Sequence, residues 1–271
     1  MKKIISLFAV SLFVISAEAS RVDTIAIVSK AMECKIKTIV ISPDVANGET
    51  AVKCPVIYLL HGYGGNEFQW LVIKPNLPQI ADEKGIIFVC PDGKNSWYID
   101  SPIDKKSQYE TFISSELIEY IDQNYNTLDD RSYRAITGLS MGGHGALFNA
   151  FRHSDVFGAA GSMSGAVDIR QIGNKYGLNL LIGNKSEDKK FYAVPNQLLR
   201  LELEDAHIFI YFDCGIKDFT FAQNEILHKL LTEKNIEHAY TVRPGAHTHA
   251  YWRNSIDYHI LFFCKFFSRE E

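Results

Sequence analysis

The stretch Arg134-Ala-Ile-Thr-Gly-Leu-Ser-Met-Gly-Gly143 decides the fold. It begins as an apolar, strand-like run and continues into a helical pattern that extends to Phe151. Between the two lies Gly138-Leu139-Ser140-Met141-Gly142, the G-x-S-x-G pattern of a nucleophile elbow. A serine on this sharp turn projects its hydroxyl above the sheet, and the glycines leave room for the turn and for close helix packing. We therefore predict that Ser140 is a nucleophile rather than part of a plain glycine-rich turn.

Apolar runs and helical patterns alternate along the chain on both sides of this turn. The predicted strands are 38–41, 56–60, 86–90, 135–137, 159–163, 208–212 and 240–242. The predicted helices are 109–125, 142–151, 221–233 and 256–267, with a shorter one near 196–203. This alternation predicts an α/β fold with a mostly parallel central sheet and helices on both faces. One domain over residues 20–271 is expected, because such folds often exceed 200 residues as one unit.

The first residues have the pattern of a secretory leader. Lys2 and Lys3 precede an apolar run from Ile4 to Ile15, and Ala17-Glu18-Ala19 follows as a small-x-small cleavage site. The apolar run is shorter than the roughly 20 residues that a membrane span needs. We expect a signal peptide over residues 1–19 and a secreted or periplasmic mature protein without stable membrane insertion.

Composition and cysteine spacing exclude several classes of protein. A net charge of -4 with no like-charge block excludes a nucleic-acid partner, which would require a basic face. The five cysteines lack the close spacing of zinc or redox motifs. Cys90 and Cys264 lie in apolar stretches and are predicted to be small buried hydrophobes. Disulfide pairing and oligomeric state are not readable from the sequence.

A serine nucleophile needs a neighbouring base, which in turn needs an orienting acid. In folds with this elbow the partners follow in the order Ser, then Asp or Glu, then His. His247 and His249 lie on a loop after the last predicted strand, at the sheet edge where α/β folds place their chemistry. We choose His247 as the base, with His249 as its rival and a solvated loop histidine as the alternative for both. His144 is expected to pack or cap near the start of its helix.

Two carboxylates follow the strand predicted over 208–212. Asp213 continues straight off the strand, where a structural role in the turn is the plain expectation. Asp218 lies deeper in the loop and has more freedom to reach the histidine Nδ1. Spacing alone prefers Asp218 only slightly, so both remain candidates for the acid.

The oxyanion of the tetrahedral intermediate needs two backbone donors. The Met141 N–H, directly after the nucleophile, is predicted to be the first. The second is the Tyr63 N–H, in the glycine-rich turn over residues 60–65 that follows a predicted strand. A phosphate-binding loop is the alternative, but the lysine and the Ser/Thr of a P-loop are absent. His61, at the strand-to-loop turn, is expected to orient this loop.

With these pieces in place, the chain resembles an esterase family of the α/β-hydrolase superfamily. That family groups the acetylxylan and feruloyl esterases of carbohydrate esterase family 1 with S-formylglutathione hydrolase and the mycolyltransferases. The resemblance spans nearly the whole chain after the leader and rests on six ordered blocks: LHGYGGN at 60–66, PDG at 91–93, NSWY at 95–98, GLSMGG at 138–143, DCGIKD at 213–218 and GAHTHAYW at 245–252.

Position by position, the resemblance implies a set of site residues: Ser140 as nucleophile, Asp218 as acid, His247 as base, and Tyr63 and Met141 as oxyanion donors. The family often has a tryptophan two residues after the histidine, where this chain has His249. Residues 95–102 resemble a part of the acyl or alcohol site in relatives. Trp97 and Tyr98 are therefore candidate rings for stacking on a sugar or an aromatic acid, with ordinary packing as the alternative. His249 is the third candidate for substrate binding.

The expected function is hydrolysis of small acyl esters through an acyl-enzyme on Ser140, with no metal and no cofactor. Export favours acetyl or feruloyl groups on plant polysaccharide over a cytosolic thioester, so S-formylglutathione hydrolase is the second candidate. A mycolyl-type transferase ranks lower, because nothing marks a long lipid channel. A non-catalytic binding member of the fold would lack the nucleophile, the base or the acid, and all three residue types are present.

Overall fold

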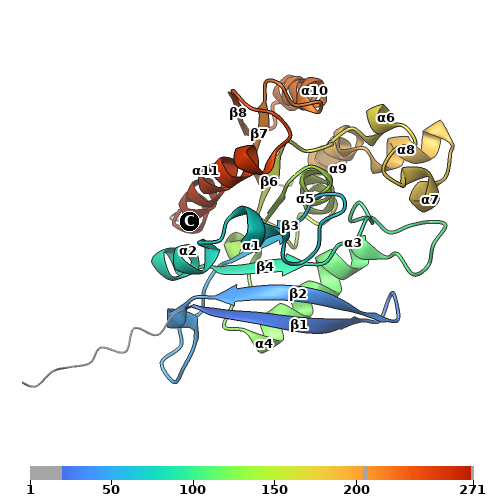
Figure 1. The fold of residues 1–271 in the computed structure, drawn as a ribbon. Coiled ribbons are helices and arrows are strands. Elements are labelled where there is room, and N and C mark those ends of the chain that lie inside the picture. The colour runs from blue at the N-terminus through green and yellow to red at the C-terminus, as the bar shows by residue number, and fades with distance from the viewer. Residues whose placement is uncertain (1–19, 204–206, 270–271) are drawn as a thin grey trace, which may run out of the picture.

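An eight-stranded sheet forms the centre of the computed structural model, which describes residues 20–203 and 207–269 (Figure 1). The order across the sheet is β1-β2-β4-β3-β5-β6-β7-β8. β2 pairs antiparallel with β1 and β4, and the other neighbours are parallel. The strands are β1 (Arg21–Ser29), β2 (Cys34–Ser42), β3 (Val56–Leu60), β4 (Ile87–Pro91), β5 (Arg134–Gly138), β6 (Ala159–Met163), β7 (Phe209–Gly215) and β8 (Ala239–Arg243). The predicted leader lies outside the described residues.

The inner strands are apolar because helices cover both of their faces. β3, β4 and β5 are buried along their whole length, as continuous apolar runs in a parallel sheet should be. All seven predicted strands overlap β2 to β8. The prediction misses β1, which pairs only with β2 at the sheet edge and carries exposed side chains along most of its length.

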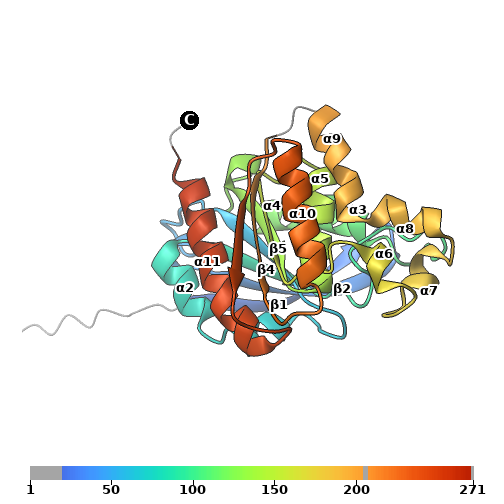
Figure 2. The same ribbon diagram turned by 90° about the horizontal axis from the view of Figure 1, so that it is seen from above.

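The helices divide between the two faces of the sheet (Figure 2). α1 (Gln69–Ile73), α2 (Leu77–Lys84) and α11 (His249–Phe267) pack over one face, in a core that includes Trp70 and Phe263. The other face is covered by α4 (Leu117–Asn124), α5 (Met141–Arg152) and α10 (Phe221–Glu233). This is the predicted α/β architecture. Among the described helices, none is long and apolar enough to span a bilayer.

Two of the predicted helices differ in the structure. The one predicted over 109–125 consists of α3 (Tyr109–Thr111), a π-helical turn η2 (Phe112–Glu116) and α4. α11 begins at His249 instead of residue 256, because the Thr248 hydroxyl oxygen accepts the Tyr251 N–H at 3.4 Å and caps the first turn. The earlier start places His249 at the N-terminus of a long helix.

Residues 168–203, which we call the cap segment, fold into short helices between β6 and β7. These are α6 (Ile169–Ile172), α7 (Leu178–Ile182), α8 (Ser186–Tyr192), the 3₁₀ turn η4 (Val194–Gln197) and α9 (Leu198–Leu203). Gly173 and Gly177 lie between α6 and α7, and Gly183 lies between α7 and α8, with φ of 70°, 69° and 83°, a region that favours glycine. Only the helix expected near 196–203 was predictable here.

The cysteines are all free, so the structure contains no disulfide among them. Cys90 is buried in the core, as predicted. Cys264 is only half-buried on α11, which corrects the expectation that it is a fully buried hydrophobe.

Candidate active site

The turn between β5 and α5 holds Ser140 in a strained conformation. Its φ is 54°, a region that residues other than glycine rarely adopt. The Ser140 N–H donates to Met163 O at 3.0 Å, and its carbonyl accepts the Ala166 N–H at 3.1 Å. A Cβ on Gly142 would lie 2.3 Å from Leu60 O, so glycine is required for this close approach. The turn has the geometry expected of a nucleophile elbow.

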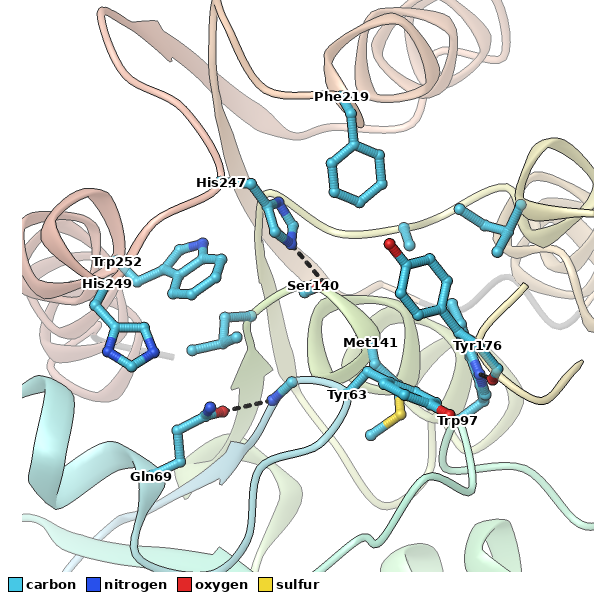
Figure 3. A pocket seen from close by; sticks show the side chains of 14 residues that line it. Tyr63, Gln69, Trp97, Ser140, Met141, Tyr176, Phe219, His247, His249 and Trp252 are labelled. Atoms are coloured by element: carbon cyan, nitrogen blue, oxygen red, sulfur yellow. Dashed lines mark hydrogen bonds between the residues drawn. The ribbon is translucent and has the colours of Figure 1, made fainter.

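His247 lies between Ser140 and Asp218, and Figure 3 shows its ring directed at Ser140. Its Nε2 is 2.8 Å from Ser140 Oγ, and its Nδ1 is 2.9 Å from Asp218 Oδ2 and 3.0 Å from Oδ1. A carboxylate only accepts hydrogen bonds, so Nδ1 carries the hydrogen and Nε2 is left to accept the serine hydroxyl hydrogen. This tautomer is the one that can take up the proton of Ser140.

The Asp218 side chain is buried and receives further hydrogen bonds from its own loop. Its Oδ1 accepts the Thr220 N–H at 2.9 Å and the Thr220 hydroxyl at 2.8 Å. Burial raises the pKa of this carboxyl, but the hydrogen bonds from His247 and Thr220 outweigh burial and hold the pKa below its usual value. Asp218 therefore stays ionised beside the imidazole at neutral pH.

The two rival residues lie apart from this chain of hydrogen bonds. Asp213 is fully buried and pairs with Arg243, whose Nη2 is 2.7 Å from Asp213 Oδ2. His249 is exposed and contacts the Trp252 ring, with centroids 5.6 Å apart. The structure thus brings Ser140, His247 and Asp218 together and gives Asp213 and His249 other neighbours.

The loop after β3 leaves one backbone donor uncommitted near Ser140. Gln69 Oε1 accepts the Gly62 N–H at 2.7 Å, and Asn95 Oδ1 accepts the Gly64 N–H at 2.8 Å. Between these two, the Tyr63 N–H has no hydrogen-bond acceptor among the described residues. A Cβ on Gly62 would lie 3.6 Å from Ser140 Cβ, so this loop packs against the elbow.

Met141 and His61 are the other two residues near Ser140 for which the sequence predicts a role at the oxyanion. The Met141 N–H, at the start of α5, is likewise uncommitted within the described part of the chain. His61 donates from Nδ1 to Gly62 O and accepts the Gly93 N–H at Nε2, both at 2.8 Å. His61 therefore ties the loop after β3 to the loop after β4, as expected of a residue that orients it.

Ser140 opens into a cavity of ≈ 220 Å³ whose sides differ in chemistry. Tyr63, Trp97 and Tyr176 lie on one side, and Gln69 and His249 lie on the opposite side (Figure 3). Two more rings contact His247 itself, Phe219 at 4.5 Å and Trp252 at 4.9 Å between centroids. The pocket therefore presents aromatic rings on one side, and on the opposite side the hydrogen-bonding groups of Gln69 and His249 lie with the Trp252 ring.

Of the candidate substrate-binding residues, Trp97 and His249 line the cavity and Tyr98 does not. The Tyr98 ring is fully buried, and its hydroxyl donates to His61 O at 3.0 Å. A Cβ on Gly93 or on Gly145 would meet this ring at 2.1 Å or 2.5 Å. Of the two alternatives left open for Tyr98, the structure favours ordinary packing, because the turn at Trp97 and Tyr98 directs this ring into the core.

The lining residues that were not predicted as site residues include Gln69, Tyr176, Phe219 and Trp252. Phe219 follows Asp218 directly, and that adjacency was the available signal. Tyr176 lies in the cap segment, where no periodicity pointed to it. Its carbonyl accepts the Trp97 indole N–H at 3.1 Å, and its ring meets Tyr63 edge-on at 5.2 Å. These contacts fix the aromatic side of the pocket.

His144 lies below the pocket and joins the nucleophile helix to the cap segment. Its Nε2 is 2.8 Å from Tyr192 O, and its Nδ1 is 3.3 Å from Trp97 O. Burial lowers the pKa of His144 to about 4. The ring is therefore neutral at pH 7 and packs near the helix start, as expected. Across residues 20–203 and 207–269, no three His, Cys, Asp or Glu side chains gather into a metal site.

Known proteins are similar to this chain in sequence and in fold. The family model described as "Putative esterase" matches residues 29–263. An acetyl esterase of Caldicellulosiruptor saccharolyticus is 30% identical over 219 residues, covering 74% of this chain and 79% of that protein. S-formylglutathione hydrolase of Bos taurus is 26% identical over 247 residues, covering 82% and 84%. A solved ferulic acid esterase has a TM-score of 0.79 at 27% identity, covering 92% of this chain and 100% of that one.

The family match spans most of the chain, and the sheet and elbow are those of an α/β-hydrolase. The chain therefore belongs to this esterase family and is a serine esterase that acts on carboxylic ester bonds.

Proposed function

We propose that Ser140 is the nucleophile of this esterase, His247 its general base and Asp218 the acid that orients the base. The observation that carries the proposal is the continuous contact from Ser140 Oγ through His247 to Asp218, at 2.8 Å and 2.9 Å. His247 Nε2 takes the hydroxyl proton as Oγ attacks the ester carbonyl carbon. The imidazolium then returns that proton to the leaving alkoxide, which departs as the alcohol and leaves an acyl-enzyme.

Water completes the cycle by the same route. His247 removes a proton from water, the hydroxide attacks the acyl carbon, and the proton passes to Ser140 Oγ as the carboxylic acid leaves. In both steps the negative charge develops on the former carbonyl oxygen. We assign its stabilisation to the Tyr63 and Met141 N–H groups, which lack other acceptors among the described residues and flank Ser140.

We propose acetyl or feruloyl groups on plant polysaccharide, or related small esters, as the substrates. Tyr63 and Tyr176, whose rings are exposed, offer an aromatic acyl group a surface for stacking, and the buried Trp97 lines the cavity on the same side. On the other side, the Gln69 Nε2 and both His249 ring nitrogens are uncommitted within the described residues, and they suit the hydroxyl groups of a sugar alcohol. The similarity to an acetyl esterase and a ferulic acid esterase supports the same assignment.

We also propose that residues 20–271 form a single esterase domain and that the protein is exported. Export rests on the leader pattern of residues 1–19, and it favours a polysaccharide ester over an intracellular thioester. Export is tested by expressing the chain with and without residues 1–19 and assaying the culture medium and the periplasmic extract for esterase activity. Activity confined to the cytoplasmic fraction with the full chain would refute export.

Hydrolysis of p-nitrophenyl acetate by the wild type and by Ser140→Ala tests the assignment of the nucleophile. The substitution is expected to lower kcat by several orders of magnitude, roughly 10⁴-fold or more, at an unchanged melting temperature. Equal rates would reject Ser140 as the nucleophile. A panel of acetylated xylan, methyl ferulate and S-formylglutathione then ranks the substrates, and a preference for the thioester would overturn the polysaccharide assignment.

A further inference from the structure

We propose that Asp213 is a positioning residue for this reaction, whose buried carboxylate holds together the three chain segments that carry Ser140, Asp218 and His247. The inference rests on the roles proposed above for these three residues. Asp213 itself does not touch the reacting atoms, because it lies below the carboxyl edge of the sheet and faces α11.

The Asp213 carboxylate joins β7, β8 and α11 through one oxygen atom. Oδ2 accepts a hydrogen bond from Arg243 Nη2 at 2.7 Å and a short one from the Ser255 hydroxyl. Arg243 Nη2 also donates to Ser255 Oγ at 2.8 Å, which closes a triangle of polar groups. Asp213 and Ser255 have no exposed surface, so water does not compete for these bonds.

Two of these partners lead directly into the loops of the site. Asp213 lies on β7 shortly before Asp218, and Arg243 ends β8 shortly before His247. Beyond the strands, the two loops stay bonded through Ile216 N–H to Arg243 O at 3.0 Å and Lys217 N–H to Gly245 O at 2.9 Å. A shift between Asp213 and Arg243 therefore moves His247 relative to Asp218.

The third connection runs through α11 to the nucleophile strand. His259 Nε2 is 3.6 Å from Asp213 Oδ2, and His259 Nδ1 is 2.9 Å from Thr137 Oγ1. Thr137 is on β5, three residues before Ser140. The carboxylate is thus hydrogen-bonded to Arg243 on β8 and to Ser255 on α11. Its connection to β5 is indirect, because His259 Nε2 packs against Asp213 Oδ2 without a hydrogen bond while His259 Nδ1 contacts Thr137.

The arrangement suits positioning better than stabilisation alone. A buried ion pair contributes little net stability, since removing both charges from water offsets most of their attraction. The reaction, however, depends on contacts whose misplacement by about 1 Å costs up to roughly 10²-fold in rate. A network that ties three loops to one buried point supplies such geometric control.

The test compares Asp213→Asn with a control variant of another carboxylate that pairs with an arginine. Asp122→Asn removes a carboxylate on α4 that accepts from Arg134 Nη2 at 2.7 Å, and Arg134 begins β5, at the opposite end of that strand from Ser140. Active sites are counted with a fluorophosphonate that labels the nucleophile, and kcat is expressed per labelled site. A purely structural role of Asp213 would change only the fraction of folded protein. Because unfolded protein is not labelled, kcat per labelled site does not depend on that fraction.

We expect Asp213→Asn to lower kcat per labelled site by about tenfold with KM within about twofold of the wild type. Asp122→Asn should lower the melting temperature and leave kcat per labelled site within about twofold. Equal kcat values for Asp213→Asn and Asp122→Asn would overturn the proposal.

Milder variants keep the test decisive if Asp213→Asn does not fold. Thr137→Val removes only the hydroxyl that contacts His259, and Thr137→Ser retains that hydroxyl. We expect about a threefold loss of kcat per site for Thr137→Val and recovery in Thr137→Ser. Unchanged kcat in Thr137→Val would contradict the network. Retained activity in Ser140→Ala would instead reject the assigned nucleophile, so the two failures are distinguishable.

Discussion

The loops after β5, β7 and β8 and the cap segment surround the same cavity, but they are built differently. The loops follow buried strands, and hydrogen bonds within and between them hold Ser140, Asp218 and His247. The cap segment consists of short helices separated by glycines at positive φ, and it contributes Ile172 and Tyr176 to the pocket wall. We infer from this difference that bond cleavage depends on the loops after β5, β7 and β8, and that the choice of ester depends on the cap segment.

His247→Ala should have the largest effect and should act on every ester alike. Without the imidazole, no group accepts the Ser140 proton, and we expect kcat to fall by roughly 10⁵-fold on both p-nitrophenyl acetate and methyl ferulate. Steady-state kinetics on the two esters measure this. A loss confined to one ester would contradict the inference that these loops act on every ester alike.

Asp218→Asn should come next, with a loss of roughly 10³-fold on both esters. The amide no longer holds the imidazole in the tautomer that accepts from Ser140, although the ring itself remains. The same substitution at Asp213 serves as the comparison, because that carboxylate contacts Arg243 and Ser255 and not His247. A larger loss at Asp213 than at Asp218 would reverse the assignment of the acid.

These loops were largely predictable from the sequence, because their determinants are local. The glycines around Ser140 indicate a tight turn, and in the structure a Cβ on Gly142 would collide with the Leu60 carbonyl oxygen. The apolar run of β3 indicates burial on both faces of the sheet. Spacing alone left Asp213 and Asp218 open, because only the three-dimensional structure shows which of the two carboxylates faces His247.

The pocket wall was poorly predictable for the opposite reason. Tyr176 reaches the pocket through a bond between its carbonyl and the Trp97 indole, which is distant in sequence and leaves no periodic pattern. Stacking and ordinary packing both stayed open for Tyr98, because a buried aromatic ring and an exposed one look alike in sequence. The early start of α11 did have a signal in Thr248, a residue type favoured at helix N-caps.

His144 joins the two regions, and its protonation should weaken the fold in acid. Its pKa of about 4 in the folded chain lies below the ordinary 6.5, so the unfolded chain binds the proton first as the pH falls. The free energy of unfolding should therefore drop by about 3 kcal/mol between about pH 7 and pH 4 from this group.

Urea unfolding of the wild type and of His144→Gln across this pH range measures the effect. The variant should lose less stability than the wild type on acidification. It should retain the contribution of His259, whose pKa burial also lowers. Parallel curves for the two proteins would show that His144 does not stay neutral in the folded chain.

Tyr176→Ala sharpens the comparison at the aromatic side of the pocket. The substitution removes the ring that meets Tyr63 but keeps the carbonyl that accepts from Trp97. We expect kcat/KM to fall about tenfold on methyl ferulate and to stay within about twofold on methyl acetate, since only the larger acyl group reaches the ring. Equal losses on both esters would mean that the cap segment supports the reaction itself.

His249→Phe should have the smallest effect and should depend on the alcohol. The phenyl ring retains contact with Trp252 but cannot hydrogen-bond. We expect about a threefold loss of kcat/KM on an acetylated xylo-oligosaccharide, none on p-nitrophenyl acetate, and recovery in His249→Gln. Because the acyl group is the same in both esters, a loss on both would place His249 on the acyl side.

The central claim is that Ser140 becomes acylated because His247 removes its proton. Incubating the wild type and His247→Ala with a fluorophosphonate, followed by mass spectrometry of the intact chain and of its peptides, tests this most directly. We expect a single adduct on the peptide that contains Ser140 in the wild type, and a labelling rate reduced by at least about 10³-fold in His247→Ala. An adduct on a different residue, or equal labelling of the two proteins, would contradict it.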